Sequence, residues 1–486
     1  MDTETASPNT ASASKTPTLV RGMSAADATF LIIGGIIGSA IFLTPKDVAQ
    51  QMRTPLLFLL VWAAGGAVTF MAGLSFAELG AMYPEAGGQY IYLREAFGDL
   101  AAFLYGWLMF IAGSSGGIAA IVVAFAAYLG KAVPAFASEK VLLALPGFAY
   151  HARHIVERPF HFTVGDFFAV SAILVLTAIN VWGLRRGVIL QNISTWLKYG
   201  ALAAFVIFGF ALGHGHLANL RLGGLGQVLH PGFHAFMSAM GVAFIAVFWS
   251  YDGWVYVAWV SGEVKNPQRS IPRALTLGIL GVVAIYLLMN TVYLYAMPLD
   301  QIASTETVGE AAAQILFSPL VAYLLSFVIA VSCVGAAASN ILAGARVSYA
   351  MAVDGLFFRR MADVHRTFRT PWFALVTQAV VACAIALSGT YEQAFTYSMF
   401  GMVLSYVASV VALMVLRRTR PNQPRPYRCP LYPWLPLAYI VLIGGWLLNT
   451  LIERPTEALV CVGFMAVGVP WYVYWKRSAG QGSVGQ

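Results

Sequence analysis

A short polar sequence interrupts the apolar stretch at residues 241–275 of this chain. Ser250, Asp252 and Gly253 lie near its middle, where a run of this length would otherwise form a continuous membrane-spanning helix. Lipid offers no water to unpaired peptide groups, so a weak backbone at mid-depth must be surrounded by protein or by a water-filled cavity. An acidic side chain at the bilayer centre costs roughly 3 kcal/mol on insertion scales. Asp252 is therefore a candidate ligand-binding residue, although it could instead cap the helix that follows.

A second weak point lies in the first apolar run, which holds Gly34, Gly38, Ser39 and Ala40. The spacing of Gly34 and Gly38 is also typical of close helix packing, so this run alone leaves both readings open. A half-helix that begins at a break directs free amides at a ligand, whereas a half-helix that ends there presents carbonyls. Two such breaks would suit a carboxylate and an ammonium group on one carbon, as in an amino acid.

Lys198 falls about ten residues inside an expected span. A lysine near the end of a span could snorkel to the interface. At the expected depth of Lys198, we instead expect the ammonium group to face the bundle and to pair with oxygen atoms. A fixed cation that bridges mobile helices would replace a diffusible one, so sodium would not be required. Proton coupling remains an alternative.

The elements that must position these residues are membrane helices. Hydrophobic residues make up 59% of the 486 residues and charged residues only 10%, with a mean hydropathy of +0.73, which excludes a soluble globular protein. Twelve apolar runs of about 18 residues or more lie between Ala28 and Trp475. The sequence therefore predicts an all-α polytopic membrane protein with twelve transmembrane helices.

The basic residues lie mostly in the loops between the apolar runs. With the N-terminus inside, twenty of the 29 Lys and Arg residues fall on the cytoplasmic side, eight fall outside and Lys198 lies within a span. This asymmetry places both termini in the cytoplasm of a multi-pass cell-membrane protein. The arginine clusters are accordingly interpreted as topology signals, not as a nucleic-acid site.

The loops and cysteines add few functional groups. Residues 84–98 combine aromatics with sparse charges, which predicts a short helix at the membrane surface. The longest external segment, residues 131–162, has three histidines in a spacing that does not suit a metal site. The four cysteines lie in spans or on the cytoplasmic side, so we expect no external disulfide.

Spans one to five and six to ten line up at an offset of roughly 205–215 residues, and both groups open with an interrupted helix. Because five is odd, the second copy must be inverted. Paired broken helices in inverted halves point to the central site of a transporter. The expected units are a disordered cytoplasmic tail at 1–23, helices 1–5 at 24–213, helices 6–10 at 214–417, a linker with helices 11–12 at 418–475, and a cytoplasmic tail at 476–486.

Several motifs are recognisable. They are IIGSAIF at 36–42, PEAGGQYIYLREAFG at 84–98, YDGW at 251–254, GEVKNPQRSIPRAL at 262–275 and SCVG at 332–335. With these motifs the chain resembles the amino acid, polyamine and organocation transporters, and most closely their L-type amino acid transporter branch. GEVKNPQRSIPRAL is the most specific of them. The resemblance implies a LeuT-type fold, a 5+5 inverted repeat with broken helices 1 and 6, that alternates between outward-facing and inward-facing states.

The resemblance also implies a set of substrate-binding residues. By position these are Ile36, Gly38, Ser39, Ala40, Trp249, Ser250, Asp252 and Gly253. Amides near Ser39 and Ala40 would hold the substrate carboxylate, and carbonyls on both broken helices would hold its amine. Trp249 would act as the gate that closes over the substrate.

Lys198 matches a lysine of sodium-independent members, where relatives place a sodium ion. Its ammonium group would join helix 1 to helix 8, through Gly38 and Ser339 or Asn340. Two departures from the family pattern matter. Ala40 stands where the family usually has glycine, which puts substrate size or affinity in doubt. Residues 131–162 also lack the cysteine that attaches animal L-type transporters to a heavy chain, so no disulfide-linked partner is expected.

The sequence therefore predicts a sodium-independent amino acid exchanger, with neutral L-amino acids as substrates and no cofactor. Asp252 leaves cationic amino acids open, because some relatives that accept them carry an acidic residue in this motif. Polyamine transport and a non-transporting amino acid sensor are alternatives. An enzyme is not expected, because no carboxylate pair, activated nucleophile or metal cluster falls at mid-depth.

Overall fold

The computed structural model describes residues 18–145, 160–221, 232–389, 391–453 and 455–482. Within these ranges the chain is predominantly helical, and ten helices are long and apolar enough to cross a membrane. Two shorter apolar helices, Phe236–Tyr251 and Trp372–Ser388, accompany them. The prediction of a helical, polytopic membrane protein is confirmed at this level.

The helices follow one another along the described chain from α1 to α19. They are α1 (Ala25–Ile36), α2 (Ala40–Leu43), α3 (Pro45–Gln51), α4 (Pro55–Met82), α5 (Gln89–Phe97), α6 (Asp99–Leu108), the π-helical turn η1 (Met109–Gly113), α7 (Ser114–Ala132), α8 (Val164–Val181), α9 (Leu184–Leu212), α10 (Phe233–Tyr251), α11 (Tyr256–Trp259), α12 (Pro267–Ala296), α13 (Leu299–Ser304), α14 (Val308–Leu316), α15 (Pro319–Val353), α16 (Trp372–Ser388), α17 (Tyr391–Thr419), α18 (Trp434–Glu453) and α19 (Pro455–Gly482).

Local signals set where these helices begin. Ser24 caps α1, because its hydroxyl accepts the Asp27 amide at 3.2 Å while the Asp27 carboxylate accepts the Ser24 amide at 2.8 Å. Ser318 caps α15 and is followed by Pro319, whose missing amide proton costs nothing in the first turn. The N-terminal ends of α1 and α15 are therefore specified by the local sequence.

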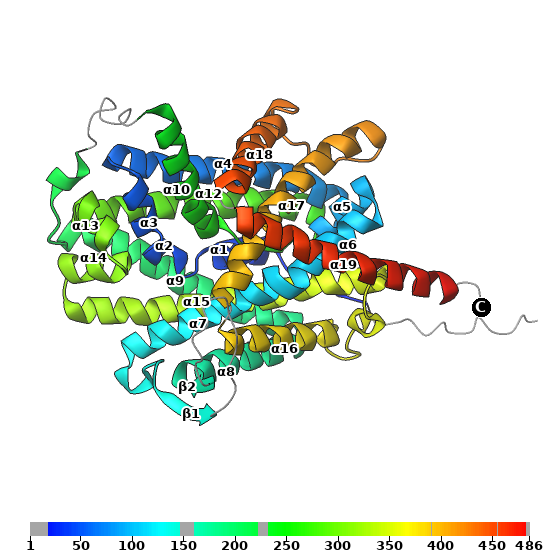
Figure 1. Cartoon of the computed structure of the whole chain (residues 1–486), viewed down its shortest axis with the longest axis horizontal. Helices are drawn as coiled ribbons and strands as arrows, with labels where there is room; N and C mark the ends of the chain where they lie inside the picture. Colours follow the sequence, from blue (N-terminus) through cyan, green and yellow to red (C-terminus); the bar gives the residue numbers. More distant parts are fainter. Residues whose placement is uncertain (1–17, 146–159, 222–231, 390, 454, 483–486) are drawn as a thin grey trace, which may run out of the picture.

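Close packing of small residues brings the long helices together. α12 packs along α4 and α15 along α7, while α1 is enclosed by α12, α9 and α15. Lipid tails are as apolar as the helices, so van der Waals contact between helices replaces water exclusion as the main driving force. Every residue between Gly335 and Ser339 of α15 is Gly, Ala or Ser and is buried. Figure 1 shows α3, α13 and α14 at one end of the bundle and α5 and the end of α19 at the other.

The short helix expected at 84–98 is present as α5, but its surface position was wrong. Tyr90 and Tyr92 are fully buried, and the Tyr92 ring meets the Phe76 ring of α4 edge-on at 5.9 Å. The aromatic residues that suggested an interfacial helix are instead packed inside the protein. α5 therefore fills the bundle at the end opposite α3, α13 and α14.

Ion pairs attach α5 to its neighbours. Arg94 Nη1 lies 2.6 Å from Asp354 Oδ2, which also accepts the Tyr90 hydroxyl at 2.9 Å. Arg420 Nη1 lies 2.6 Å from Glu95 Oε2. Burial alone would raise the pKa of Glu95, but hydrogen bonds from Arg420 and Arg94 outweigh it and lower the pKa.

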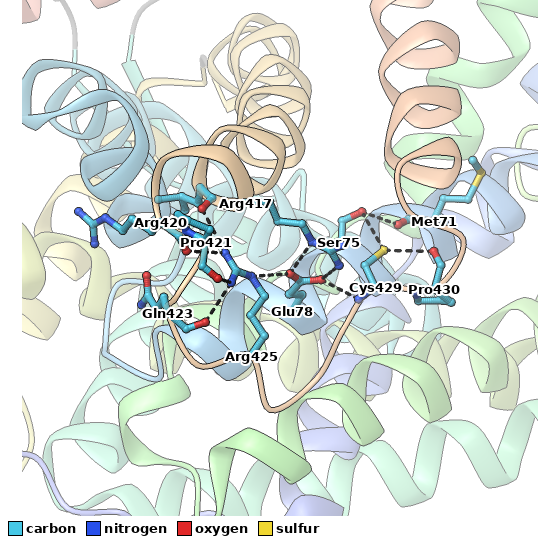
Figure 2. Close-up of polar contacts among 11 residues, drawn as sticks. Met71, Ser75, Glu78, Arg417, Arg420, Pro421, Gln423, Arg425, Cys429 and Pro430 are labelled. Carbon is cyan, nitrogen blue, oxygen red and sulfur yellow. Dashed lines mark hydrogen bonds and ion pairs between the residues drawn. The ribbon is translucent and has the colours of Figure 1, made fainter.

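A buried carboxylate organises the linker between α17 and α18 (Figure 2). Glu78 of α4 is fully buried and accepts Arg417 Nε at 2.8 Å and the Cys429 amide at 2.7 Å. Arg425 Nε lies 3.4 Å from the same carboxylate, and its other nitrogens donate to four carbonyls of residues 416–423. The proline-rich linker is therefore fixed to α4.

At two places the described chain departs from the expected units. Most of the 1–23 tail lies outside the described residues, but Met23 is buried and exchanges backbone hydrogen bonds with Glu263 and Lys265 at 3.0 and 2.8 Å. α19 continues to Gly482, into the segment assigned to the C-terminal tail. An antiparallel pair that was not predicted, β1 (Val141–Leu145) and β2 (Phe160–Thr163), lies between α7 and α8.

Candidate functional site

The first predicted interruption lies between α1 and α2. α1 ends at Ile36 and α2 begins at Ala40, with extended backbone at Ile37 (φ −75°, ψ 97°). The described part of the chain supplies no backbone acceptor for the amides of Gly38, Ser39 and Ala40. These amides are the groups that a helix N-terminus offers to an anion.

The second predicted interruption lies between α10 and α11. α10 ends at Tyr251, Asp252 is extended (φ −69°, ψ 158°), and Gly253 has φ +103°. A Cβ placed on Gly253 would lie 2.6 Å from the carbonyl oxygen of Gly35 in α1. The backbones of the two broken helices therefore touch directly, at a position where the conformation and the space both require glycine.

Gly34 and Gly38 have different roles in the structure. A Cβ on Gly34 would lie 2.4 Å from Thr195 Oγ1, so this glycine permits α1 to approach α9 closely. A Cβ on Gly38 would meet only the Ala336 Cβ, at an ordinary 3.8 Å. The interpretation as close helix packing therefore applies to Gly34, whereas Gly38 lies in the interruption between α1 and α2.

Lys198 is buried and its ammonium group reaches the end of α1. Nζ donates to the carbonyls of Gly34 at 2.6 Å, Ile37 at 2.7 Å and Ser332 of α15 at 3.4 Å. The lysine therefore joins α9 to the broken end of α1 and to α15. Its charge satisfies carbonyls that the ending helix leaves without an intrahelical partner.

These contacts differ from the partners predicted for Lys198, which were Gly38 and Ser339 or Asn340. Ser339 Oγ donates to the carbonyl of Gly335 in its own helix at 2.9 Å, and Asn340 Oδ1 accepts the Ser114 hydroxyl at 2.7 Å. α1 stays helical to Ile36, and the two carbonyls of this segment that Lys198 meets belong to Gly34 and Ile37, four residues and one residue before Gly38. The proposed coupling role of Lys198 remains a prediction.

A cavity of about 610 Å³ lies against the two breaks. Six of the eight predicted substrate residues line it, namely Ile36, Gly38, Ser39, Ala40, Trp249 and Asp252. Ser250 and Gly253 do not line it: the Ser250 hydroxyl is fully buried, donates to the Ala246 carbonyl at 2.8 Å and lies 2.7 Å from Thr44 Oγ1. Trp249 is 38% exposed on the cavity wall.

The cavity leads toward one end of the bundle. Its lining continues to Lys131 at the end of α7 and to Thr307 before α14. At the opposite end, Arg346 and Glu263 form a fully buried ion pair, with Nη2 and Oε2 at 2.9 Å. Together with the Arg94–Asp354 pair, this contact closes the bundle on the side of α5.

Asp252 faces the cavity with one oxygen engaged. The hydroxyl of Tyr406 in α17 donates to Asp252 Oδ1 at 2.5 Å. On the other break, the Tyr286 hydroxyl donates to the Ile36 carbonyl at 3.2 Å. Tyrosines from α17 and α12 thus orient the polar groups of the two breaks.

Several cavity residues were missed in the sequence. Tyr256 and Trp259 line the cavity beyond the second break, and the aromatic-rich run after YDGW was a signal that could have indicated them. Ser114 of α7 also lines it, as does Asn340 of α15, which was predicted as a coupling residue and not as a cavity residue. The place of Ser114 on the cavity wall could not be predicted from the sequence, because it follows a π-helical turn that depends on packing.

Comparisons with known proteins find relatives over most of the chain. The family model described as amino acid permease matches residues 24–471. The serine/threonine exchanger SteT of Bacillus subtilis is 30% identical over 93% of this chain and 95% of its own length. The b(0,+)-type amino acid transporter 1 of Mus musculus is 29% identical over 95% and 90%, and the human large neutral amino acids transporter small subunit 2 is 26% identical over 97% and 84%.

Proposed function

Since the chain belongs to the amino acid permease family, we propose that it is a sodium-independent exchanger that moves neutral L-amino acids across the cell membrane by alternating access. The family and its relatives of the L-type branch are transporters, so the chain is a transporter and not an enzyme. One relative is named a serine/threonine exchanger and another a transporter of large neutral amino acids. These names support exchange and neutral substrates.

The observation that carries this proposal is the meeting of two broken helices on one cavity. The free amides of Gly38, Ser39 and Ala40 would hold the substrate carboxylate, because they offer donors and the positive end of a helix dipole. Carbonyls at the ends of α1 and α10 would hold the amine. Trp249, on the wall beside them, would move to close the site.

The arrangement of the whole chain follows the same proposal. We assign twelve spans, the ten long helices and the two shorter ones, with helices 1–5 and 6–10 as inverted repeats of the LeuT type. Both termini would be cytoplasmic. The cavity then leads to the outside, and the ion pairs near α5 close the cytoplasmic side.

Lys198 supports independence from sodium. Its ammonium group already occupies the carbonyls that a cation would need at the end of α1. The absence of cysteine from residues 131–162 supports transport without a disulfide-linked heavy chain. The four cysteines are free, and none of them is in the external segment.

Counterflow in proteoliposomes tests the proposal. Vesicles loaded with unlabelled amino acids should accumulate radiolabelled leucine or alanine in sodium-free buffer, whereas empty vesicles should not. Uptake that requires sodium would contradict the role given to Lys198. Failure of leucine, alanine and arginine to exchange against any internal amino acid would contradict transport. Saturable binding without uptake would indicate a sensor, and competition by putrescine a polyamine transporter.

Asp252 favours one alternative, a carrier of cationic amino acids. Its carboxylate lines the cavity and keeps one oxygen free of the Tyr406 bond. If arginine is carried, Asp252→Asn should lower arginine uptake at least tenfold, since a charged hydrogen bond contributes about 1.5–3 kcal/mol. Leucine uptake should stay within about threefold if the substrates are neutral. The ratio of the two rates in one preparation decides between them.

A further inference from the structure

A polar cluster outside the two breaks lies on the wall of the same cavity. The Gln378 amide nitrogen of α16 donates to Ser114 Oγ at 3.1 Å, and the Ser114 hydroxyl donates to Asn340 Oδ1 at 2.7 Å. All three side chains are nearly fully buried. Ser114 and Asn340 line the cavity.

The cluster fixes the direction of the Asn340 amide. Its oxygen is occupied by Ser114, while its Nδ2 has no hydrogen-bond partner among the described residues. Nδ2 retains some accessible surface, whereas the unpartnered oxygen of Gln378 is fully buried. Asn340 therefore offers N–H donors on the cavity wall.

The local backbone is built to bring Ser114 to this position. It follows the π-helical turn Met109–Gly113, a feature that occurs frequently at functional sites. A Cβ on Gly344, one turn beyond Asn340 in α15, would lie 2.0 Å from Ser114 Oγ. Glycine at this position therefore gives the serine access to α15.

We propose that Asn340 selects substrates whose side chain carries an uncharged oxygen, a hydroxyl or a carboxamide. Nδ2 would donate a hydrogen bond to that oxygen, and Ser114 positions the amide to do so. A carboxylate side chain would accept the same bond, but the Asp252 carboxylate, which lines the same cavity, disfavours a second negative charge. The inference rests on the proposed transport of amino acids and adds a preference among the neutral ones.

Threonine and valine provide the test, because they have the same shape and differ by one hydroxyl. In counterflow, the wild type should prefer threonine to valine by about five- to tenfold, as expected for one hydrogen bond. Asn340→Leu should bring this ratio to about one, because threonine uptake should fall more than valine uptake. Asparagine against leucine repeats the comparison for a carboxamide.

Two further variants separate selection from folding. Ser114→Ala keeps Asn340 but removes its anchor, so the threonine-to-valine ratio should fall while uptake of valine persists. Thr450→Val removes a hydroxyl elsewhere on the wall, one that donates to the Trp446 carbonyl at 3.0 Å, and should keep the wild-type ratio. A second readout needs no variant: threonine should raise the melting temperature of the purified wild type more than valine does.

The outcomes are distinct. Exchange of alanine by the wild type without a preference for threonine or asparagine would overturn this inference and leave the proposed function standing. A preference that survives in Asn340→Leu would also overturn it. Absence of any amino acid exchange in the wild type would instead overturn the proposed function itself, and the inference with it.

Discussion

Lys198 joins three helices through one side chain. It is buried between α9, α1 and α15 and gives its donors to the Gly34 and Ile37 carbonyls. Lys198→Met would leave the Gly34 carbonyl unpaired inside the protein, at about 1–3 kcal/mol, while the Ile37 carbonyl would keep the Ser332 hydroxyl at 3.1 Å. We expect exchange in sodium-free vesicles to fall at least tenfold and the melting temperature in detergent to drop.

Lys140→Met is the matched control for this change, because Lys140 is exposed in the external segment. It should leave both exchange and melting temperature at wild-type values. Lys198→Met protein that exchanges at the wild-type rate would show that the lysine is a structural filler and not a replacement for a cation.

At the residue scale, the burial of Lys198 was predictable and its partners were not. A lysine at mid-span had to face protein, because lipid cannot solvate it, and it does. Which carbonyls it meets depended on where α1 ends, and helix ends are set by contacts that one sequence does not reveal. Ser250 is polar and lies at the break, yet its hydroxyl faces Thr44 instead of the cavity.

At the scale of elements, the contact between the two broken helices is the most restrictive feature. Gly253→Ala would combine a strained φ of +103° with a Cβ 2.6 Å from backbone, which cannot move like a side chain. We expect a destabilisation of about 3 kcal/mol or more and loss of exchange. Size-exclusion profiles and melting curves of detergent extracts measure the first effect.

Gly98→Ala controls for the strain alone. Gly98 has φ +87°, but a Cβ added there would meet nothing within 4 Å, so the cost should be about 1–2 kcal/mol and exchange should persist. Equal losses in the two variants would mean that the approach of α1 to Gly253 has no special importance.

The linker between α17 and α18 provides a second prediction at this scale. Glu78→Gln would leave the Arg417 and Arg425 guanidinium groups without their carboxylate, and breaking one side of a buried pair costs about 3–5 kcal/mol. The melting temperature should fall clearly. Glu306→Gln is the control, because this carboxylate is 84% exposed opposite Lys46 and should contribute less than about 1 kcal/mol.

Elements of regular length were predictable from hydrophobicity, because a bilayer imposes a minimum length on every span. The two interruptions were predictable because polar and flexible residues stand out against that background. The burial of α5 was not predictable, because aromatic residues are equally common at a membrane interface and in a packed protein interior. The π-helical turn at Met109–Gly113 also escaped, because no residue in it is unusual for a helix.

At the scale of the molecule, orientation is the property that most needs a direct measurement. Glu306→Cys should react with a membrane-impermeant maleimide in intact cells, because this exposed residue lies at the end we assign to the outside. Arg418→Cys, exposed in the last turn of α17, should react only once the membrane is permeabilised. The opposite pattern would invert the topology, and the unsubstituted protein gives the background from its own four cysteines.

Charge asymmetry along the chain was enough to predict this orientation, but not the contacts that close one side. Glu78 and Arg417 are 339 residues apart, and Arg94 and Asp354 are 260 apart. Such pairs arise from the three-dimensional arrangement of helices, which spacing in one sequence does not encode. The cavity volume is equally a property of the assembled bundle.

The touching backbones of Gly35 and Gly253 limit how this chain can diversify. A Cβ on Gly253 would lie 2.6 Å from the Gly35 carbonyl oxygen. One on Gly35 would lie 2.7 Å from the Tyr256 ring and 3.0 Å from the Gly253 carbonyl oxygen, so a side chain is obstructed at either position. Related transporters that evolve a new substrate preference must therefore change residues of the surrounding cavity wall, such as those of α7 and α15, and keep the two glycines.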